Sequence, residues 1–493
     1  MRNLSEPIQW HADTKGSETA IIFGDRRISY ATLNLYINRY CAYLKKVGVV
    51  PGDIVGLDVG DTPEHVFLLF ALTRMCAVIL PLDVKWTFAE KSLVVTHFSA
   101  KLVITDSPNQ PFAAGIGVSQ LESQNQDKGH TWPIDHDLSV PFLISLSSGT
   151  TGRPKGPLIN QEHFFRRFIT HWVNLGLNSD SRLLINTPLY FGGGRTFAMS
   201  VLVSGGAIHL PEERLAAVDM AAYIQDKGVN SLFLVPTQLR RLLDLSNPGE
   251  LLLGDLTLLL CSGAPLSPLE RRRAVASLCP NFYEYYASTE GGGVSLSGPL
   301  ARDVHAESVG RPVFGVSVQI VDDDDRPLST GRIGRLRYTG PGVAQGFLND
   351  PDETRSHFSN GWFYPGDLAE IDQQGFIYLR GRAKDMIISG GINVYPNEIE
   401  DVIRGIEGIV DVAVVGIPDA DLGERVVCAW VGVDGLGEEV VRDKCKERLA
   451  SYKVPKQWSK RTNLPMNSSG KVLKREIQSF FGDAGYQPGP ANV

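Results

Sequence analysis

The chain has 493 residues, of which 43% are hydrophobic and 21% are charged, a composition typical of a globular protein with two or more packed units. Its net charge is −7, with Lys and Arg residues spread along the chain, so no nucleic-acid partner is expected. We therefore expect the partners to be small molecules.

The six cysteines stand at wide spacings, with no Cys-x-x-Cys pair and no histidine cluster beside them. This spacing argues against a disulfide framework or a structural zinc site, and it fits a reducing, cytoplasmic setting. The first residues lack the apolar core of a signal peptide. The most apolar stretch, 66–82, is interrupted by Thr73 and Arg74 and is too short to span a bilayer, so no membrane insertion is expected.

The first 300 residues alternate apolar, β-rich runs with amphipathic stretches. This alternation is typical of an α/β fold, in which helices cover largely parallel sheets. We predict helices over residues 30–47 and 63–75. The predicted strands are residues 19–23, 54–57, 77–80, 102–104, 183–185, 207–210, 231–235 and 257–261.

The pattern changes after about residue 305, where short strands and frequent turns predict a small barrel-like β section. Its four consecutive aspartates, 322–325, are expected to form a solvated hairpin tip rather than a metal site. The predicted strands of this section are residues 316–321 and 334–338.

A compact α+β unit is predicted from residue 384 onward. We therefore divide the chain into a large N-terminal domain, residues 1–383, and a small C-terminal domain, residues 384–493. The elements predicted in the smaller domain are helices over 396–405 and 438–449 and strands over 410–416 and 425–433.

One segment, residues 147–156, combines four hydroxyls, three glycines and two cations directly after an apolar run. Glycines let backbone N–H groups face an anion, hydroxyls donate further hydrogen bonds, and Lys155 supplies a compact positive charge. The segment is therefore predicted to hold a polyphosphate. It is not a Walker loop, because Pro154 follows Gly149 by five residues and no Gly-Lys-Ser/Thr sequence comes next. A flexible Ser/Gly linker is the alternative, but it leaves Lys155 and Pro154 unexplained.

Three further segments carry side chains suited to chemistry. Tyr286, Thr289 and Glu290 precede a run of glycines, and they suit a site that stacks a base, contacts a phosphate and holds a hard cation. Asp367 either accepts from sugar hydroxyls, as acidic residues do for ribose, or is a simple turn aspartate. Lys471 lies on a Gly/Ser loop. It is either a mobile cation that reaches a neighbouring domain or an ordinary surface lysine.

Together and in this order, the motifs resemble the adenylate-forming superfamily of acyl- and aryl-CoA synthetases, peptide-synthetase adenylation domains and luciferases. The resemblance covers nearly the whole chain, and it implies an enzyme that uses ATP and Mg²⁺. Such an enzyme converts a carboxylic acid into an acyl-adenylate and releases pyrophosphate. The most specific segments are residues 147–156, 286–290, 362–367, 381–400 and 470–471.

The resemblance also implies roles for individual residues. Lys471 would bridge the substrate carboxylate and the α-phosphate, and Glu290 would help to bind Mg²⁺. This step needs no covalent nucleophile and no base, because cations neutralise the developing charge and the acid is already ionised near pH 7. The other implied ligands are Ser147, Ser148, Thr150, Thr151 and Lys155 for the β- and γ-phosphates, Gly263, Ala264, Pro265 and Tyr286 for adenine, Thr289 for the α-phosphate, and Asp367 and Arg382 for the ribose.

The acceptor of the adenylate is indicated by residues 389–396, whose Ser-Gly-Gly-x-Asn-x-Tyr-Pro form resembles that of CoA ligases. In the family, the small domain rotates at the position matched by Lys384, which removes Lys471 and brings Gly391 to the thioester site. The resemblance therefore implies a carboxylic acid:CoA ligase. A stand-alone enzyme that loads a separate carrier protein and a silent nucleotide-binding protein are the alternatives, and a homodimer is left open.

The acid pocket departs from the family pattern. Phe191 replaces the usual histidine, Ala287 replaces a glycine, and no aspartate stands beside Phe191, which argues against an α-amino acid. Glycines at 192–194 and 291–293 are expected to leave space for an aryl or acyl acid whose identity stays open. Arg195 either binds a second carboxylate or points outward. The other predicted wall residues are Gly192, Val235, Pro236, Thr237, Ser262, Gly263 and Gly291.

Overall fold

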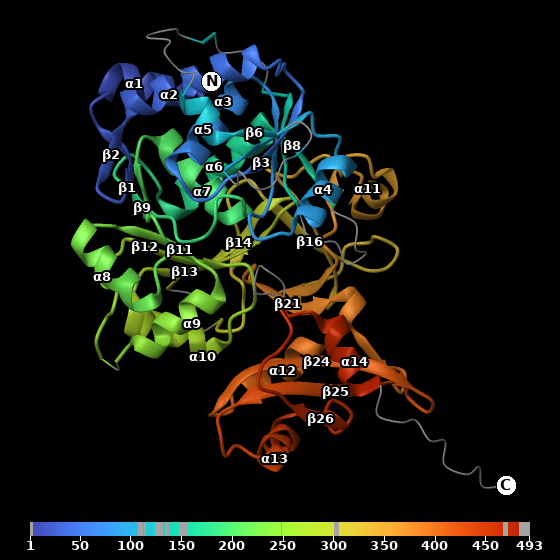
Figure 1. Ribbon diagram of the computed structural model, residues 1–493. Coiled ribbons are helices and arrows are strands. Elements are labelled where there is room, and N and C mark those ends of the chain that lie inside the picture. The colour runs from blue at the N-terminus through green and yellow to red at the C-terminus, as the bar shows by residue number, and fades with distance from the viewer. Residues whose placement is uncertain are drawn as a thin grey trace, which may run out of the picture.

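The computed structural model describes residues 3–106, 112, 115–123, 132–133, 138–146, 155–247, 249–299, 305–466 and 472–482. Its large N-terminal part contains two mixed sheets covered by helices and one antiparallel sheet, and a small α+β unit follows (Figure 1). The predicted α/β class and the order of these parts are confirmed.

A six-stranded sheet, in the order β6-β5-β3-β4-β7-β8, forms the first unit. All neighbouring strands are parallel except β7 and β8. Strands β4 and β5 are buried throughout, which explains why their residues are a continuous apolar run rather than an alternating one. The strands are β3 (Ile54–Asp58), β4 (Val78–Pro81), β5 (Leu102–Thr105), β6 (Gly115–Gly117), β7 (Pro141–Ile144) and β8 (Leu158–Asn160).

A nine-stranded sheet forms the second unit, in the order β15-β14-β13-β12-β11-β9-β10-β1-β2. Its central strands are parallel and its two edges are antiparallel. The strands predicted in this unit differ from the observed ones by at most one residue at either end. The strands are β1 (Thr19–Phe23), β2 (Arg26–Ser29), β9 (Arg182–Leu184), β10 (Ala207–Leu210), β11 (Ser231–Leu234), β12 (Leu258–Ser262), β13 (Phe282–Ser288), β14 (Gly292–Ser297) and β15 (Arg311–Pro312).

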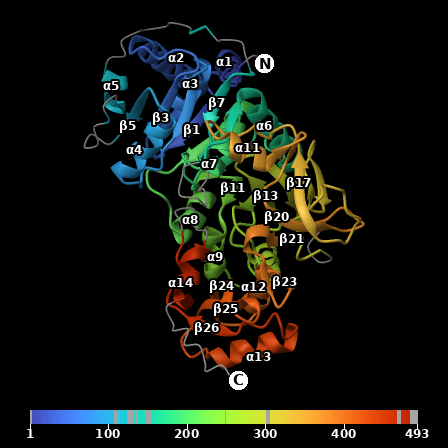
Figure 2. The same ribbon diagram turned by 90° about the vertical axis from the view of Figure 1, so that its right-hand side faces the viewer.

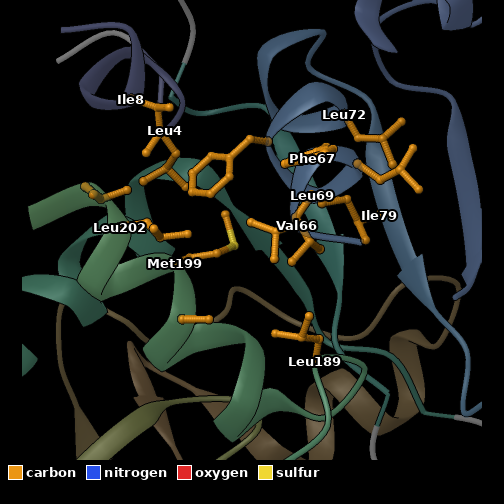
Figure 3. Close-up of a cluster of buried hydrophobic side chains, with 14 of the residues drawn as sticks. Leu4, Ile8, Val66, Phe67, Leu69, Leu72, Ile79, Leu189, Met199 and Leu202 are labelled. Carbon is orange, nitrogen blue, oxygen red and sulfur yellow. The ribbon is translucent and has the colours of Figure 1, made fainter. Parts of the chain in front are cut away.

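Helices α1, α2, α3, α6 and α7 pack on one large hydrophobic core, and α8 and α9 pack on a second one. Figure 3 shows apolar side chains of α3, including Phe67 and Leu69, opposite Met199 and Leu202 of α7. The helices are α1 (Glu6–Lys15), α2 (Tyr30–Lys46), α3 (Pro63–Arg74), α4 (Phe88–His97), α5 (Val118–Ser123), α6 (Gln161–Leu175), α7 (Gly192–Ser204), α8 (Ala217–Lys227), α9 (Pro236–Leu245) and α10 (Pro268–Arg273), which continues as the π-helical turn Ala274–Leu278.

The apolar stretch 66–82 is a buried helix that leads into a strand, as its pattern predicts. Arg74 at the end of α3 is fully buried and donates to Oδ1 of Asn38 at 2.6 Å and to Oγ of Ser5 at 3.1 Å. These partners let a cation lie within the core. Within the described part of the chain, no helix has both the length and the apolar character that a membrane crossing requires.

An antiparallel sheet forms the section that was predicted to be barrel-like. The aspartates 322–325 form its exposed turn, where Arg326 and Arg335 pair with them. No group of potential metal ligands occurs among the described residues. The elements are β16 (Ser317–Val321), β17 (Gly334–Thr339), α11 (Pro351–His357), β18 (Phe358–Ser359), β19 (Trp362–Phe363), β20 (Asp367–Ile371) and β21 (Ile377–Arg382).

The C-terminal unit has its own hydrophobic core, around Ile399, Trp430 and Cys445, and it lies apart from the large N-terminal part in both views (Figures 1 and 2). A short 3₁₀ turn, Ala383–Asp385, precedes it, so the predicted boundary at residue 384 falls within this turn. The elements are β22 (Ile387–Ser389), β23 (Ile392–Val394), α12 (Pro396–Arg404), β24 (Ile409–Asp419), β25 (Gly423–Gly432), α13 (Glu438–Arg448), β26 (Gln457–Lys460) and α14 (Lys474–Gly482).

Candidate active site

Three predicted ribose and adenine ligands from two sheets meet in one cluster. The hydroxyl of Tyr286 donates to Oδ2 of Asp367, and Oδ1 of Asp367 accepts from Nε of Arg382 at 2.9 Å. Asp367 opens β20 and Arg382 closes β21, and the two residues pair in register across this hairpin. Tyr286 comes from β13, so the fold brings together motifs that lie far apart in the sequence.

The Tyr286–Asp367–Arg382 cluster is partly shielded from water, and Asp367 has only 9% of its surface exposed. Burial and the adjacent charge of Asp367 raise the pKa of Tyr286 well above its ordinary value, so this phenol remains a neutral donor. A carboxylate accepts several hydrogen bonds at once. The cluster therefore suits a ligand that presents hydroxyl groups and a flat ring.

The segment predicted to face adenine lies beside this cluster. Strands β12 and β13 are parallel neighbours, with Ser262 opposite Tyr285. Residues 263–265 therefore follow β12, and Tyr286 lies in the last part of β13, at the same edge of the sheet, where ligands of α/β folds commonly bind. Gly263 has a φ of +111°, which favours glycine, and it lies against Val235, the residue before α9.

The turn between β13 and β14 carries Thr289 and Glu290. Oγ of Ser288 accepts from the backbone N–H of Gly291 at 2.9 Å and lies 2.7 Å from the hydroxyl of Tyr338. The turn is therefore tied both to itself and to β17 of the antiparallel sheet. These contacts hold the backbone on both sides of Glu290 in one conformation.

The Glu290 side chain fits the predicted role of a Mg²⁺ ligand. The carboxylate is half-buried and makes no hydrogen bond or ion pair with any described residue. Its charge acts on Arg382 and Arg167. A free carboxylate among fixed cations supplies the hard oxygen atoms that Mg²⁺ prefers.

The predicted phosphate-binding loop is described only from Lys155 onward, and Ser147, Ser148, Thr150 and Thr151 lie outside the described residues. Lys155 forms an ion pair with Glu353 of α11. The imidazole of His357 lies 3.3 Å from the same carboxylate oxygen. Lys155 therefore has an anionic partner within the protein, and its role towards the phosphates stays a prediction.

Lys384 lies near several other charged groups. Burial lowers the pKa of Lys384, the charge of Asp385 opposes this shift, and the charges of Arg382, Arg475 and Lys155 add to it. Cations close enough to act on one another in this way repel, and a bound anion would relieve that repulsion.

The residues predicted for domain movement and thioester formation belong to the C-terminal unit. Lys384 lies in the turn Ala383–Asp385. Gly391 lies at the tip of the β22–β23 hairpin with a φ of +77°, and nothing lies near its Cα where a side chain would stand. Lys471 lies outside the described residues, and the segment after it is held by an ion pair between Lys474 and Glu400 at 3.0 Å.

We expected the glycines at 192–194 and 291–293 to leave open space for the acid. This expectation is wrong for most of them. A Cβ at Gly193 would lie 2.5 Å from the ring of Phe233, and Cβ atoms at Gly291 and Gly293 would overlap Tyr338 and Tyr285. These glycines make room for aromatic rings of the protein itself. Of the six glycines, Gly192 alone faces open space.

Phe191 directly precedes α7, and its ring lies 4.8 Å from that of Tyr190. Val235 directly follows β11 and caps α9, and Thr237 is the second residue of that helix. Ala287 lies at a bulge between β13 and β14 and is exposed. The structure therefore gathers the predicted wall residues around the carboxyl ends of β11, β12 and β13, with Phe191 at the start of the adjacent helix.

Arg195 does not point outward, so this alternative is wrong. The side chain has 1% of its surface exposed, and Nη1 donates to the carbonyls of Leu189 and Tyr190 at 3.2 and 3.1 Å. Burial lowers its pKa to about 9. Arg195 makes no ion pair among the described residues, and it stabilises the turn that leads to Phe191.

Two residues near the site were missed in the sequence. Glu353 pairs with Lys155 from 198 positions away, and no local pattern marks it. Arg167 of α6 donates to three backbone carbonyls near Glu290. A signal for Arg167 exists, because it is a charged residue between Phe164 and Phe168 on the buried face of an amphipathic helix.

Comparisons with known proteins identify the family of the chain. The family model for AMP-binding enzymes matches residues 8–348, and the model for the C-terminal domain of these enzymes matches residues 398–471. The feruloyl-CoA synthase of an Amycolatopsis species is 30% identical over 94% of this chain and 96% of its own. The indoleacetate–CoA ligase of Aromatoleum aromaticum is 30% identical over 97% and 98%.

A fatty acid–[acyl-carrier-protein] ligase of Streptomyces coeruleorubidus, ScoC, is 28% identical over 98% of both chains. The solved structure of ATP-bound MatB from Rhodopseudomonas palustris superposes with a TM-score of 0.89 and 28% identity, and covers 98% of this chain and 99% of that one. The chain belongs to the AMP-binding enzyme family, as an adenylate-forming enzyme of the kind that includes acyl- and aryl-CoA ligases.

Proposed function

We propose that the protein is an ATP-dependent carboxylic acid:CoA ligase, which forms an acyl-adenylate with release of pyrophosphate and then a CoA thioester. The observation that carries this proposal is the joint placement of two features. The Tyr286–Asp367–Arg382 cluster suits a nucleoside, and the cations Lys155, Arg382 and Lys384 converge beside it.

In this proposal Asp367 and Arg382 hold the ribose of ATP. The Tyr286 hydroxyl is engaged by Asp367, which fixes the ring so that one face is presented to adenine, opposite residues 263–265. Lys155 and the preceding hydroxyl-rich segment receive the β- and γ-phosphates. Binding requires Lys155 to exchange its ion pair with Glu353 for the phosphates.

Glu290 would hold Mg²⁺ and Thr289 would contact the α-phosphate. The ion would neutralise the negative charge that develops on the phosphates. The residues of this chain position the ionised acid and orient the α-phosphate, and Lys471 bridges the two anions. No side chain has to remove a proton from the acid, because a carboxylic acid is ionised near pH 7.

The acid itself is an aryl or acyl acid in this proposal, bound near Phe191, Gly192 and Ala287. Aromatic rings fill the space beside Gly193, Gly291 and Gly293, so the described lining is apolar. Such a lining disfavours an α-amino acid, whose ammonium group needs a buried carboxylate partner.

CoA is proposed as the acceptor, with the exposed backbone at Gly391 beside the pantetheine arm and the small domain, residues 384–493, pivoting at Lys384. The names of the feruloyl-CoA and indoleacetate–CoA relatives support this choice. Loading of a separate carrier protein is the second candidate, and the similarity to ScoC favours it. The enzyme is proposed to act in the cytoplasm, as a monomer or a homodimer.

The test is a panel of aryl, fatty and short-chain acids in an ATP–pyrophosphate exchange assay with purified protein and Mg²⁺. At least one acid should stimulate exchange, while the same protein without acid stays at background. Exchange that no acid stimulates, in a protein shown to be folded by circular dichroism, would contradict the adenylation half of the proposal.

A further inference from the structure

Arg167 lies on α6, the helix that follows the predicted phosphate-binding loop. Its side chain has 6% of its surface exposed. Nε donates to the carbonyl of Gly342 at 2.9 Å, Nη1 to the carbonyl of Thr289 at 3.3 Å and Nη2 to the carbonyl of Glu290 at 2.9 Å. One guanidinium therefore connects three segments of the chain at the Glu290 turn.

We infer that Arg167 is a positioning residue for adenylation, which holds the backbone of Thr289 and Glu290 in place. This inference rests on the proposed function of the site. Arg167 acts through the backbone of the turn rather than by touching the substrates.

The turn is shaped to receive this one side chain. A Cβ at Gly342 would approach Cγ of Arg167 at 2.6 Å, and a Cβ at Gly292 would approach its side-chain atoms at 3.0 Å. Glycines on both sides of the guanidinium thus provide the room that it occupies. The backbone N–H of Ala344 donates to the same Glu290 carbonyl at 2.8 Å, which adds a second donor at this oxygen.

The choice of partners keeps the Glu290 carboxylate free. Arg167 forms no ion pair within the described residues, and its donors all reach main-chain carbonyls. Burying a cation without a carboxylate partner is costly, and burial lowers the pKa of Arg167 to about 10. A guanidinium bound to carbonyls holds the turn and leaves the anionic side chain available for a metal ion.

Arg167 lies on the helix that follows Lys155 in the chain. The helix begins at Gln161, six residues after Lys155, and Asn160 caps it by accepting from the backbone N–H of His163 at 2.7 Å. This cap stabilises the first turn of the helix. Lys155 and the Glu290 turn are therefore connected through β8, α6 and the side chain of Arg167.

The test compares Arg167→Met with Arg166→Met in the full-length enzyme. Arg166 is the next residue on the same helix, but its side chain is 44% exposed and pairs only with Glu162. The first readout is the rise in melting temperature on adding MgATP, relative to ATP with a chelator. The second is the Mg²⁺ concentration needed for half-maximal ATP–pyrophosphate exchange. The third is the rate of thioester formation from a supplied acyl-adenylate.

Arg167→Met should lose most of the MgATP-dependent stabilisation and require at least about tenfold more Mg²⁺, because loss of a residue that supports a metal ligand costs about 10- to 100-fold in metal affinity. Thioester formation from the adenylate should fall much less. Arg166→Met should match the wild type in every readout. An Arg167→Met enzyme with wild-type MgATP stabilisation and Mg²⁺ dependence would overturn the inference.

A second variant guards against simple misfolding. Gly342→Ala keeps the cation but pushes on Cγ of Arg167, so it should raise the Mg²⁺ requirement in the same direction, and an unchanged requirement would count against the inference. If the wild type itself shows no acid-dependent exchange, the proposed function fails. If the wild type exchanges and both variants equal it, only the role of Arg167 fails.

Discussion

At the scale of single residues, the fold keeps two histidines uncharged inside the N-terminal part. Burial, with a smaller contribution from the charge of Arg167, lowers the pKa of His171 to about 3. Burial likewise lowers the pKa of His209 to about 4. The ring of His171 stacks on Phe197 at 4.4 Å, so it serves as part of an aromatic cluster behind the predicted acid pocket.

The pKa of His171 gives a pH dependence of stability with a definite sign. Below pH 6.5 the unfolded state binds a proton that the folded state excludes, so the free energy of unfolding falls as pH falls. The expected loss is about 2 kcal/mol between pH 7.5 and 5 for this group. Urea unfolding of His171→Phe should show a smaller loss than the wild type, whereas His97→Gln, on the exposed side of α4, should leave the loss unchanged. Equal slopes in all three proteins would contradict this assignment.

At the scale of elements, the turn between β13 and β14 depends on glycine for packing rather than for open space. A Cβ at Gly291 would overlap the ring hydroxyl of Tyr338, which is also hydrogen-bonded to Ser288. The glycine run therefore lets β17 approach β13 closely. The turn holds Glu290 only as long as this approach is preserved.

Gly291→Ala should destabilise the protein by about 1–3 kcal/mol, because overpacking forces backbone shifts, and it should slow exchange. Tyr338→Phe alone should cost about 1 kcal/mol through the lost hydrogen bond. The double variant should lose somewhat less than the sum of the two, since the phenyl ring lacks the oxygen nearest to the new Cβ but keeps the ring carbon at 2.4 Å. Strictly additive losses, measured by thermal and urea unfolding, would show that Tyr338 does not occupy the space beside Gly291.

The sequence predicts elements well where the signal is local. Strands β3, β4 and β11 are short apolar runs, and their bounds are recovered within one residue. The Asp367–Arg382 pair and its contact with Tyr286 depend on the register of β20 and β21 and on the approach of another sheet. No local pattern encodes such contacts. The resemblance to known motifs indicated these residues but not the contacts between them. The pairing of Lys155 with Glu353 was missed because it also joins distant segments.

The space beside the glycines could not be predicted, because only the packed structure shows which rings fill it. Phe233, Tyr285 and Tyr338 come from three strands, and each occupies room next to a glycine of another segment. A glycine in a sequence marks room near the backbone. Whether a ligand or a neighbouring side chain takes that room is decided by packing.

At the scale of the whole molecule, a compact C-terminal unit follows the N-terminal part through the turn at Lys384. Within this unit, Glu400 is buried and accepts from Lys474, Arg404 and the backbone N–H of Val414. This network ties α14, the element directly after Lys471, to α12. The proposed domain alternation therefore moves the Lys471 segment and the Gly391 hairpin as parts of one body.

The central claim is that one enzyme adenylates a carboxylic acid and passes the acyl group to CoA. The most direct measurement is quantification of acyl-CoA, AMP and pyrophosphate by mass spectrometry, with the best acid of the panel, MgATP and CoA. The account predicts equal amounts of the three products. It also predicts that Lys471→Ala makes none of them from the acid but still forms acyl-CoA from supplied acyl-adenylate. AMP and pyrophosphate without acyl-CoA, or equal loss of both steps in Lys471→Ala, would contradict it.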